Sequence, residues 1–345
     1  MILIAFLYCA AVAAIAAAVT FAVARRRFLM DVPNARSSHA APVPRSGGLG
    51  IVTATILGVV VLGLDGHPAL LRDSGFFAVL IGGLIAAAGG LADDIRTRSF
   101  VFKFAVQLVA AGLTIAMGLA LDTLYVPGLG PVHLGMFGPL ITLLWMVGLT
   151  NAYNFMDGID GLAGGTAVIA AVFLTLAALL IKEFNEAALA STLAAASLGF
   201  VIFNLPPARV FMGDVGSQFV GFAFAALGVV VARDDPTGTL AFLVPLLLFH
   251  FIFDTLVTAG RRWWRGEKVT QAHRSHLYQR LTPPGASHGR TTAFLSTIAV
   301  LQGVGALFLA TLPPEKRLLV FLPAIALQLV YLFLVVRREN AVTAP

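Results

Sequence analysis

Residues 75–98 read GFFAVLIGGLIAAAGGLADDIRTR, an apolar run that ends in two acids and two arginines. Residues 75–92 carry no charge, and a helix of this length can cross the hydrocarbon core of a bilayer. Similar runs recur along the chain, in which 59% of 345 residues are hydrophobic and 12% are charged. Soluble domains have about 45–50% and 25%. The composition excludes a soluble protein and predicts an all-α polytopic membrane protein.

We expect about eleven transmembrane helices in a single integral-membrane domain, residues 1–345. They cover approximately residues 1–24, 46–64, 75–92, 100–121, 137–153, 163–181, 187–205, 217–232, 239–259, 291–311 and 318–336. The first run has no basic residue before it and Arg25, Arg26 and Arg27 after it, the reverse of a cleavable signal peptide. It should remain as a span with the N-terminus outside, so an odd number of spans places the C-terminus in the cytoplasm.

The basic residues support this orientation. The predicted cytoplasmic segments hold 18 of the 23 Lys and Arg residues, as the positive-inside rule requires. The cytoplasmic loops are then approximately residues 25–45, 93–99, 154–162, 206–216 and 260–290. The net charge of +6 comes without an aromatic-basic surface, so we expect membrane lipids and phosphorylated substrates as partners and no nucleic acid.

Acidic residues beside glycines gather on the predicted cytoplasmic face. They stand in GGLADD, NFMDGIDGLAGG and FMGDVGS, and are Asp93, Asp94, Asp157, Asp160 and Asp214. Each taken singly is also a common turn or cap residue. Three such segments on one face can converge on a hard divalent cation through carboxylate oxygens, an arrangement that suits phosphoryl transfer.

The acids of the outer loops lack such motifs, and we expect them to be solvated loop charges. They are Asp65, Asp73, Asp122, Glu183, Glu186, Asp234, Asp235 and Glu315. Transporter sites tend to lie near the bilayer midplane, whereas the motif acids here lie at one face. This placement favours an enzyme over a secondary transporter, the main alternative from another class; a non-catalytic scaffold is a weaker one.

Two cytoplasmic loops carry basic residues and histidines. In the loop at 260–290, His273 and His276 lack a third nitrogen or sulfur ligand, so the sequence gives only weak support for a zinc site. With Arg274 between them, phosphate binding is the better interpretation. The proline-rich first loop carries Arg36 and Arg45 and has the composition of a phosphate-attracting loop.

Two features lie inside the spans. His250 and Asp254 are spaced i, i+4, which predicts a pair on one helix face. The glycines of GGLIAAAGG have the spacing of close helix packing. A homodimer built on such packing is open.

The motifs together resemble one family. DVPNARSSHAAPVPRSGG, GLADDIRTRS, NAYNFMDGIDGLAGG, VFMGDVGSQFVG and AHRSHLYQRL, over about residues 31–290, are similar to the polyprenyl-phosphate N-acetylhexosamine-1-phosphate transferases. The resemblance implies a bacterial inner-membrane enzyme that transfers a sugar-1-phosphate from a UDP-sugar to undecaprenyl phosphate, releases UMP and uses Mg²⁺, with Mn²⁺ as a substitute. The loop HRSHLYQ lacks the three consecutive histidines of the phospho-N-acetylmuramoyl-pentapeptide branch, so the O-antigen-type branch is favoured and the peptidoglycan branch is the alternative.

The resemblance also implies residue roles. It makes Asp93, Asp94, Asp157 and Asp160 catalytic and Asp214 the Mg²⁺ ligand, with Asp94 as a second candidate ligand. It places the substrates against Asn154, Lys103, His273 and His276. From the composition of their loops we add Arg36, Arg45 and Arg274 as substrate-binding candidates. We favour direct attack of the lipid phosphate on the sugar-proximal phosphorus, because a phosphomonoester is largely dianionic at neutral pH. A covalent aspartyl-phosphate route stays open.

Overall fold

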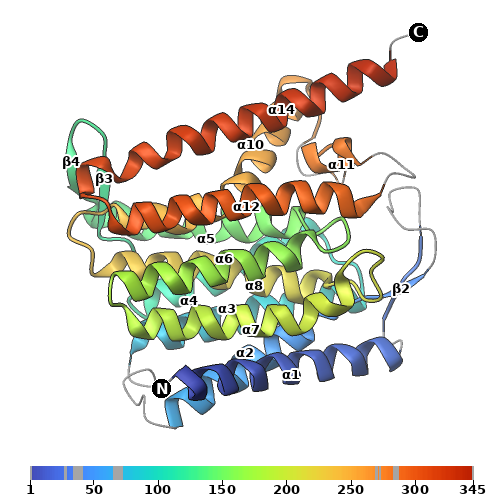
Figure 1. The fold of residues 1–345 in the computed structure, drawn as a ribbon, viewed down its shortest axis with the longest axis horizontal. Coiled ribbons are helices and arrows are strands. Elements are labelled where there is room, and N and C mark those ends of the chain that lie inside the picture. The colour runs from blue at the N-terminus through green and yellow to red at the C-terminus, as the bar shows by residue number, and fades with distance from the viewer. Residues whose placement is uncertain are drawn as a thin grey trace.

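The computed structural model describes residues 2–26, 29–33, 42–64, 73–268, 271, 273–282 and 287–343. Its helices run side by side in one bundle, and the two chain ends lie at opposite ends of it (Figure 1), as an odd number of crossings requires. Arg36 and Asp65 lie outside the described residues.

The principal helices follow the predicted segments. They are α1 (Ile2–Arg26), α2 (Leu49–Leu64), α3 (Ser74–Ile95), α4 (Phe100–Ala116), α5 (Gly138–Phe155), α6 (Leu162–Leu180), α7 (Phe184–Asn204), α8 (Gly213–Arg233), α9 (Leu243–Leu247), α10 (Phe249–Trp264), α12 (His288–Thr311) and α14 (Phe321–Thr343). Short helices are α11 (Leu277–Leu281) and α13 (Pro314–Arg317), and η1 (Gly135–Phe137), η2 (Leu240–Phe242) and η3 (Leu318–Val320) are 3₁₀ turns.

The predicted fold class is confirmed. Within the described ranges, eight helices are long and apolar enough to cross a membrane, and one bent pair makes a ninth. The shorter apolar helices α2 and α4, of 16 and 17 residues, complete the eleven predicted segments.

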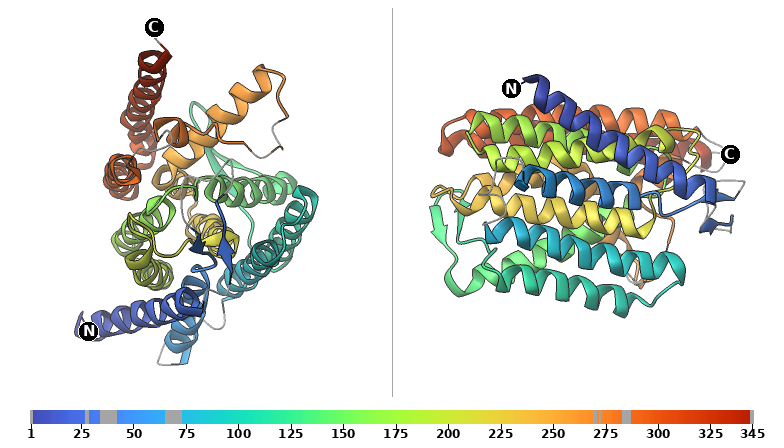
Figure 2. Two further views of the ribbon diagram at one scale, coloured as in Figure 1. Left: turned by 90° about the vertical axis from the view of Figure 1, so that its right-hand side faces the viewer. Right: turned by 90° about the horizontal axis from the view of Figure 1, so that it is seen from below.

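The ninth predicted span is not one straight helix. Residues Leu240–Leu247 and Phe249–Trp264 are bent by 73° at Leu248. Past the break, α10 carries His250, Asp254 and two arginines, too many polar side chains for a simple lipid-facing span. Viewed along the bundle, α10 runs obliquely outward while its neighbours are seen nearly end-on (Figure 2).

Helix α8 lies at the centre of the bundle (Figure 2), and its most apolar stretch of 18 residues is entirely buried. It packs on α3 through glycines: a Cβ on Gly90 would lie 2.3 Å from the carbonyl oxygen of Asp214, and one on Gly82 would lie 2.4 Å from the Phe222 ring. The predicted close packing of this glycine-rich segment is confirmed, and it holds the end of α3 against the start of α8.

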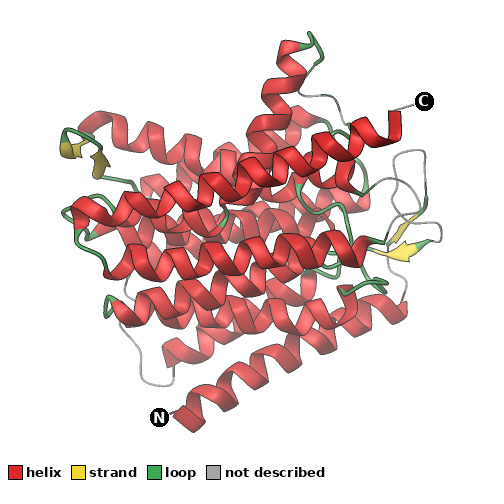
Figure 3. Ribbon diagram, turned by 45° about the horizontal axis from the view of Figure 1, so that its top comes forward, coloured by secondary structure: helices red, strands yellow, loops and turns green. Residues whose placement is uncertain are grey.

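The structure adds two small antiparallel sheets at opposite ends of the bundle (Figure 3). Strands β1 (Met30–Asp31) and β2 (Val43–Pro44) lie within the first predicted cytoplasmic loop, residues 25–45, and β3 (Thr123–Val126) and β4 (Gly130–His133) form a hairpin. These strands of two to four residues are too short to show an alternating apolar pattern, which is why the sequence did not reveal them.

Several outer-loop acids are not the solvated charges we predicted. Asp73 caps α3 through the Gly75 amide and makes a bidentate ion pair with Arg233, the last residue of α8. Asp235 and Glu186 are 9% and 6% exposed. Asp235 accepts hydrogen bonds within its own turn, which removes the need for solvent. The prediction holds for exposed acids such as Asp122, Asp234 and Glu315.

Candidate active site

Four polar side chains from four helices meet at the end of the bundle near β2. Lys103 Nζ lies 3.1 Å from Asp93 Oδ2 and 3.0 Å from Asp214 Oδ2, so one ammonium bridges two carboxylates. Asn154 Nδ2 donates to Asp214 Oδ1 at 3.2 Å. The structure therefore brings together residues that the sequence analysis assigned to one site from segments up to 121 positions apart.

Local structure places the lysine opposite the acids. Asp93 stands near the end of α3 and accepts the Arg98 amide at 2.6 Å, which closes a short turn. Ser99 then caps α4 by accepting the Phe102 amide. Lys103 follows one turn into α4 and points back at Asp93.

Asp94 holds the start of α8. Its carboxylate accepts hydrogen bonds from the backbone amides of Asp214 and Val215 at 3.0 and 3.1 Å and from Ser46 Oγ at 2.9 Å. Gly213 has a φ of +73°, and a Cβ there would lie 2.6 Å from Asp94 Oδ2, so the turn requires glycine. Asp94 thus fixes the position of Asp214; its catalytic and metal-binding roles stay predictions.

Asp157 lies in the turn between α5 and α6, and within the described part of the chain no hydrogen bond reaches its carboxylate. Burial and the negative charges of Asp214 and Asp94 raise its pKa to about 8. Lys103 is already shared by two other carboxylates. The site therefore carries more acid than the protein itself neutralises.

This excess of acid suits a divalent cation. Among the described residues, no three His, Cys, Asp or Glu side chains lie close enough to form a metal site by themselves. Mg²⁺ commonly takes only one or two carboxylates and leaves its other positions to water and substrate phosphate. Asp214 and Asp157 carry carboxylate oxygens of the kind that Mg²⁺ takes, so the residue types fit the Mg²⁺ prediction, which stays a prediction.

Asp160 makes its contacts elsewhere. Its Oδ1 lies 3.1 Å from His288 Nδ1 and its Oδ2 accepts the Ala208 amide at 3.0 Å. Its carbonyl oxygen accepts from Thr292 in α12. These contacts tie the turn before α6 to the loop before α8 and to α12, so the geometry supports an organising role; its catalytic role stays a prediction.

His250 and Asp254 of α10 do not form the pair that we predicted. His250 Nδ1 lies 2.7 Å from Gln302 Oε1, whereas Asp254 Oδ1 lies 3.0 Å from His276 Nδ1. The i, i+4 prediction is wrong because each side chain finds a partner on another helix. His273 contacts Ser275 Oγ at 3.0 Å.

Burial, with His276 and Arg262 nearby, lowers the pKa of His273 to about 4. A neutral His273 can bind phosphate only through a hydrogen bond and adds no positive charge at pH 7. Arg274, next to it, is half-buried. Positive charge for an anionic substrate must come from the arginines and Lys103.

Arg45 lies beside the carboxylates. Its Nη2 donates to the carbonyl oxygen of Asp94, and its Nε is buried without a hydrogen-bond partner among the described residues. A guanidinium with an unused donor near the site is consistent with the predicted binding of phosphate.

Comparison with known proteins shows which family the chain belongs to. Residues 76–232 match Glycosyl transferase family 4. The chain is 31% identical over 282 residues to the probable undecaprenyl-phosphate N-acetylglucosaminyl 1-phosphate transferase of Bacillus subtilis (strain 168), covering 81% of this chain and 77% of that protein. This chain belongs to the polyprenyl-phosphate sugar-1-phosphate transferase family.

Two other relatives mark the breadth of the family. The decaprenyl-phosphate N-acetylglucosaminephosphotransferase of Mycobacterium tuberculosis (strain H37Rv) is 33% identical over 319 residues, with 85% of this chain and 78% of that protein covered. The phospho-N-acetylmuramoyl-pentapeptide-transferase of Streptococcus thermophilus is 34% identical over 206 residues, with 55% and 59% covered. Family membership rules out the transporter alternative.

A layer of amides beneath the transferase site escaped the sequence analysis. Gln107 Nε2 donates to Gln218 Oε1 at 2.8 Å, and Asn151 Nδ2 donates to Gln107 Oε1 at 2.6 Å. Each amide follows or precedes a site residue by one helical turn: Gln107 after Lys103, Gln218 after Asp214, Asn151 before Asn154. This spacing was the signal available in the sequence.

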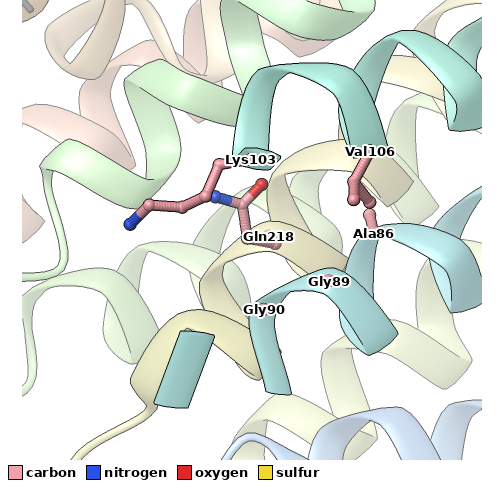
Figure 4. A pocket seen from close by; sticks show the side chains of 6 residues that line it. All are labelled: Ala86, Gly89, Gly90, Lys103, Val106 and Gln218. Carbon is pink, nitrogen blue, oxygen red and sulfur yellow. The ribbon is translucent and has the colours of Figure 1, made fainter. Parts of the chain in front are cut away.

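A small pocket of about 10 Å³, the room of one water molecule, borders this layer (Figure 4). It is lined by Ala86, Gly89, Gly90, Lys103, Val106 and Gln218. The amide layer sets the register of α4, α5 and α8, and so the convergence of the residues above it.

Proposed function

We propose that this protein transfers an N-acetylhexosamine-1-phosphate from a UDP-sugar to undecaprenyl phosphate, giving undecaprenyl-diphosphate-sugar and UMP. The observation that carries the proposal is Lys103 bridging Asp93 and Asp214, with Asp157, whose pKa is raised by burial and by neighbouring carboxylates, beside them at one end of a membrane bundle. Phosphoryl transfer needs such a mixture of positioning and charge neutralisation more than it needs covalent chemistry.

The chemistry follows from the charges. An oxygen of the dianionic lipid phosphate attacks the sugar-proximal phosphorus of the donor; a new P–O bond forms, the bond to the UMP oxygen breaks, and UMP leaves. No strong base is required, because the phosphomonoester already carries its charge at neutral pH. Lys103 and Arg45 offset negative charge on the two substrates. Mg²⁺, held by Asp214 and Asp157, would supply further charge neutralisation on the diphosphate.

Asp93 is best placed to orient the acceptor. Its carboxylate contacts both Lys103 and the backbone amide of Arg98, so its orientation is fixed. A carboxylate held in this way keeps the ammonium of Lys103 between Asp93 and Asp214, where we place the acceptor phosphate.

The donor proposal rests on the relatives and on one loop. The Bacillus and Mycobacterium relatives are named for N-acetylglucosamine phosphate transfer, and their matches cover 81% and 85% of this chain, against 55% for the Streptococcus thermophilus pentapeptide transferase. The loop HRSHLYQ also lacks three consecutive histidines. We therefore place the protein in the bacterial inner membrane, with its site facing the cytoplasm, at the start of O-antigen or a related envelope glycan.

Competition between donors tests this proposal. Purified protein in detergent receives undecaprenyl phosphate, Mg²⁺ and either UDP-N-acetylglucosamine, another UDP-N-acetylhexosamine or UDP-muramoyl-pentapeptide, and the lipid product is separated and quantified. We expect product from a UDP-N-acetylhexosamine. Preferential use of the pentapeptide donor would place the protein in the peptidoglycan branch.

A further inference from the structure

Asp254 in α10 is fully buried, and five donors surround its carboxylate. Oδ1 accepts from Thr258 Oγ1 (3.2 Å), His276 Nδ1 (3.0 Å) and the Leu277 amide (2.9 Å), and Oδ2 accepts from the Tyr278 amide (3.0 Å) and Tyr331 Oη (3.1 Å). Through these hydrogen bonds, the Asp254 carboxylate joins α10, α11 and α14. Asp254 is therefore the anchor of the histidine loop.

This anchor fixes the tautomer of His276. A carboxylate only accepts hydrogen bonds, so Nδ1 of His276 must carry the proton and donate it to Asp254. At the start of α11 the backbone amide of Gln279 also donates to the His276 side chain. We assign the Nδ1 proton to the contact with Asp254, because a carboxylate is a stronger hydrogen-bond acceptor than a ring nitrogen. Nε2 is the nitrogen left for another ligand, as in metal and catalytic sites where a carboxylate holds the far nitrogen of a histidine.

The His276 ring is seated against the segment that carries two predicted site residues, 154–158. Its centroid lies 5.8 Å from that of Phe155. Tyr278 Oη donates to the Phe155 carbonyl at 3.1 Å, and a Cβ on Gly158 would lie 2.0 Å from the same Oη. The loop and the segment are thus held together, and the contact of Nδ1 with Asp254 leaves Nε2 on the edge of the imidazole that does not contact Asp254.

We propose that Asp254 is a positioning residue that holds His276 by Nδ1 so that Nε2 contacts the diphosphate of the UDP-sugar. Asp254 itself is enclosed between α10, α11 and α14 and does not touch the substrate. This inference rests on the proposed transferase function and adds to it the residue that orients the histidine motif.

Two substitutions of His276 test the orientation. In His276→Asn the amide nitrogen stands where Nδ1 was and can still donate to Asp254, but nothing replaces Nε2. In His276→Gln the amide reaches the place of Nε2 and loses the contact with Asp254. We expect His276→Asn to melt like the wild type yet lose at least about 100-fold in kcat, and His276→Gln to keep more activity at a lower melting temperature. Wild-type turnover in folded His276→Asn would overturn the proposal.

A double-mutant cycle tests whether Asp254 acts through His276. Asp254→Asn should lower kcat/KM by about 10- to 100-fold, mainly in kcat, in the wild-type background. In the His276→Asn background the same change should cost less than about threefold, because coupled residues are not additive. Tyr331→Phe, which removes another donor from the same carboxylate, should stay within about threefold of wild type. Equal losses in both backgrounds would contradict the proposal.

The outcomes remain separable. If Asp254→Asn does not fold, the comparison of His276→Asn with His276→Gln still decides the question. If the wild type transfers no sugar phosphate, the proposed function fails. If the wild type is active and the cycle is additive, only the role of Asp254 fails.

Discussion

Replacing Asp157 with Asn should stabilise the protein while abolishing its activity. In the unfolded chain the carboxyl has its ordinary pKa of 3.8, whereas in the folded protein burial and neighbouring carboxylates raise that pKa to about 8. Between these values the unfolded state is ionised and the folded state keeps the proton. Stability therefore falls as pH rises from about 4 to about 8, and Asn removes this loss.

The size of the effect follows from the shift. One pKa unit corresponds to 1.36 kcal/mol, so the interval from 3.8 to pH 7 sets a ceiling of about 4 kcal/mol. Because the side chain is partly exposed, solvent screening reduces this, and we expect roughly 1–2 kcal/mol at pH 7. This gain should raise the melting temperature by a few degrees.

The assay is thermal unfolding of purified protein in detergent with a chelator, at pH 5, 6, 7 and 8. The gap between Asp157→Asn and wild type should widen with pH and shrink when Mg²⁺ and a UDP-sugar are added to the wild type. Glu315→Gln, at an exposed acid, is the matched control and should show no such gap. A melting temperature of Asp157→Asn equal to that of the wild type at pH 8 would refute the reasoning.

Three other predictions follow from the site and the bundle. Asp214→Asn should fold normally but lose at least about 100-fold in turnover relative to Glu315→Gln, because it removes the charge that would hold the cation; near-normal turnover at limiting Mg²⁺ would exclude Asp214 as principal ligand. Gln218→Leu should lower the free energy of unfolding by about 1–3 kcal/mol by leaving one amide hydrogen of the buried Gln107 without its acceptor, and the double Leu variant should recover part of it in denaturant titrations. A cysteine at exposed Ser287 should react with an impermeant thiol reagent only in opened membranes, whereas one at Glu315 should react in intact spheroplasts; the reverse pattern would invert the predicted orientation.

The sequence predicted the features that depend on local runs of residues. Lengths of apolar runs located the helices, and the acids at their ends, Asp93, Asp157 and Asp214, pointed to one face. Basic residues in the loops gave a predicted orientation. These features can be predicted from the sequence because the length of a span and the charge of a loop depend only on neighbouring residues.

Features that depend on partners far along the chain were missed. Of the five donors to Asp254, only Thr258 is near it in the sequence. The other four lie 22 to 77 residues away, where no local pattern reveals them. The amide layer of Gln107, Asn151 and Gln218 likewise forms only when three helices pack. The strands of two to four residues are too short to give a pattern in the sequence.

Tracing the two phosphates of the donor tests the central claim most directly. Purified protein is given a UDP-N-acetylhexosamine labelled at the sugar-proximal phosphorus, with undecaprenyl phosphate and Mg²⁺, and lipid and nucleotide products are separated. The account predicts that the label moves to the lipid in amounts equal to the UMP released, and only when both lipid phosphate and Mg²⁺ are present. Label that stays in released UDP, or UMP formed without the lipid, would contradict sugar-1-phosphate transfer by this protein.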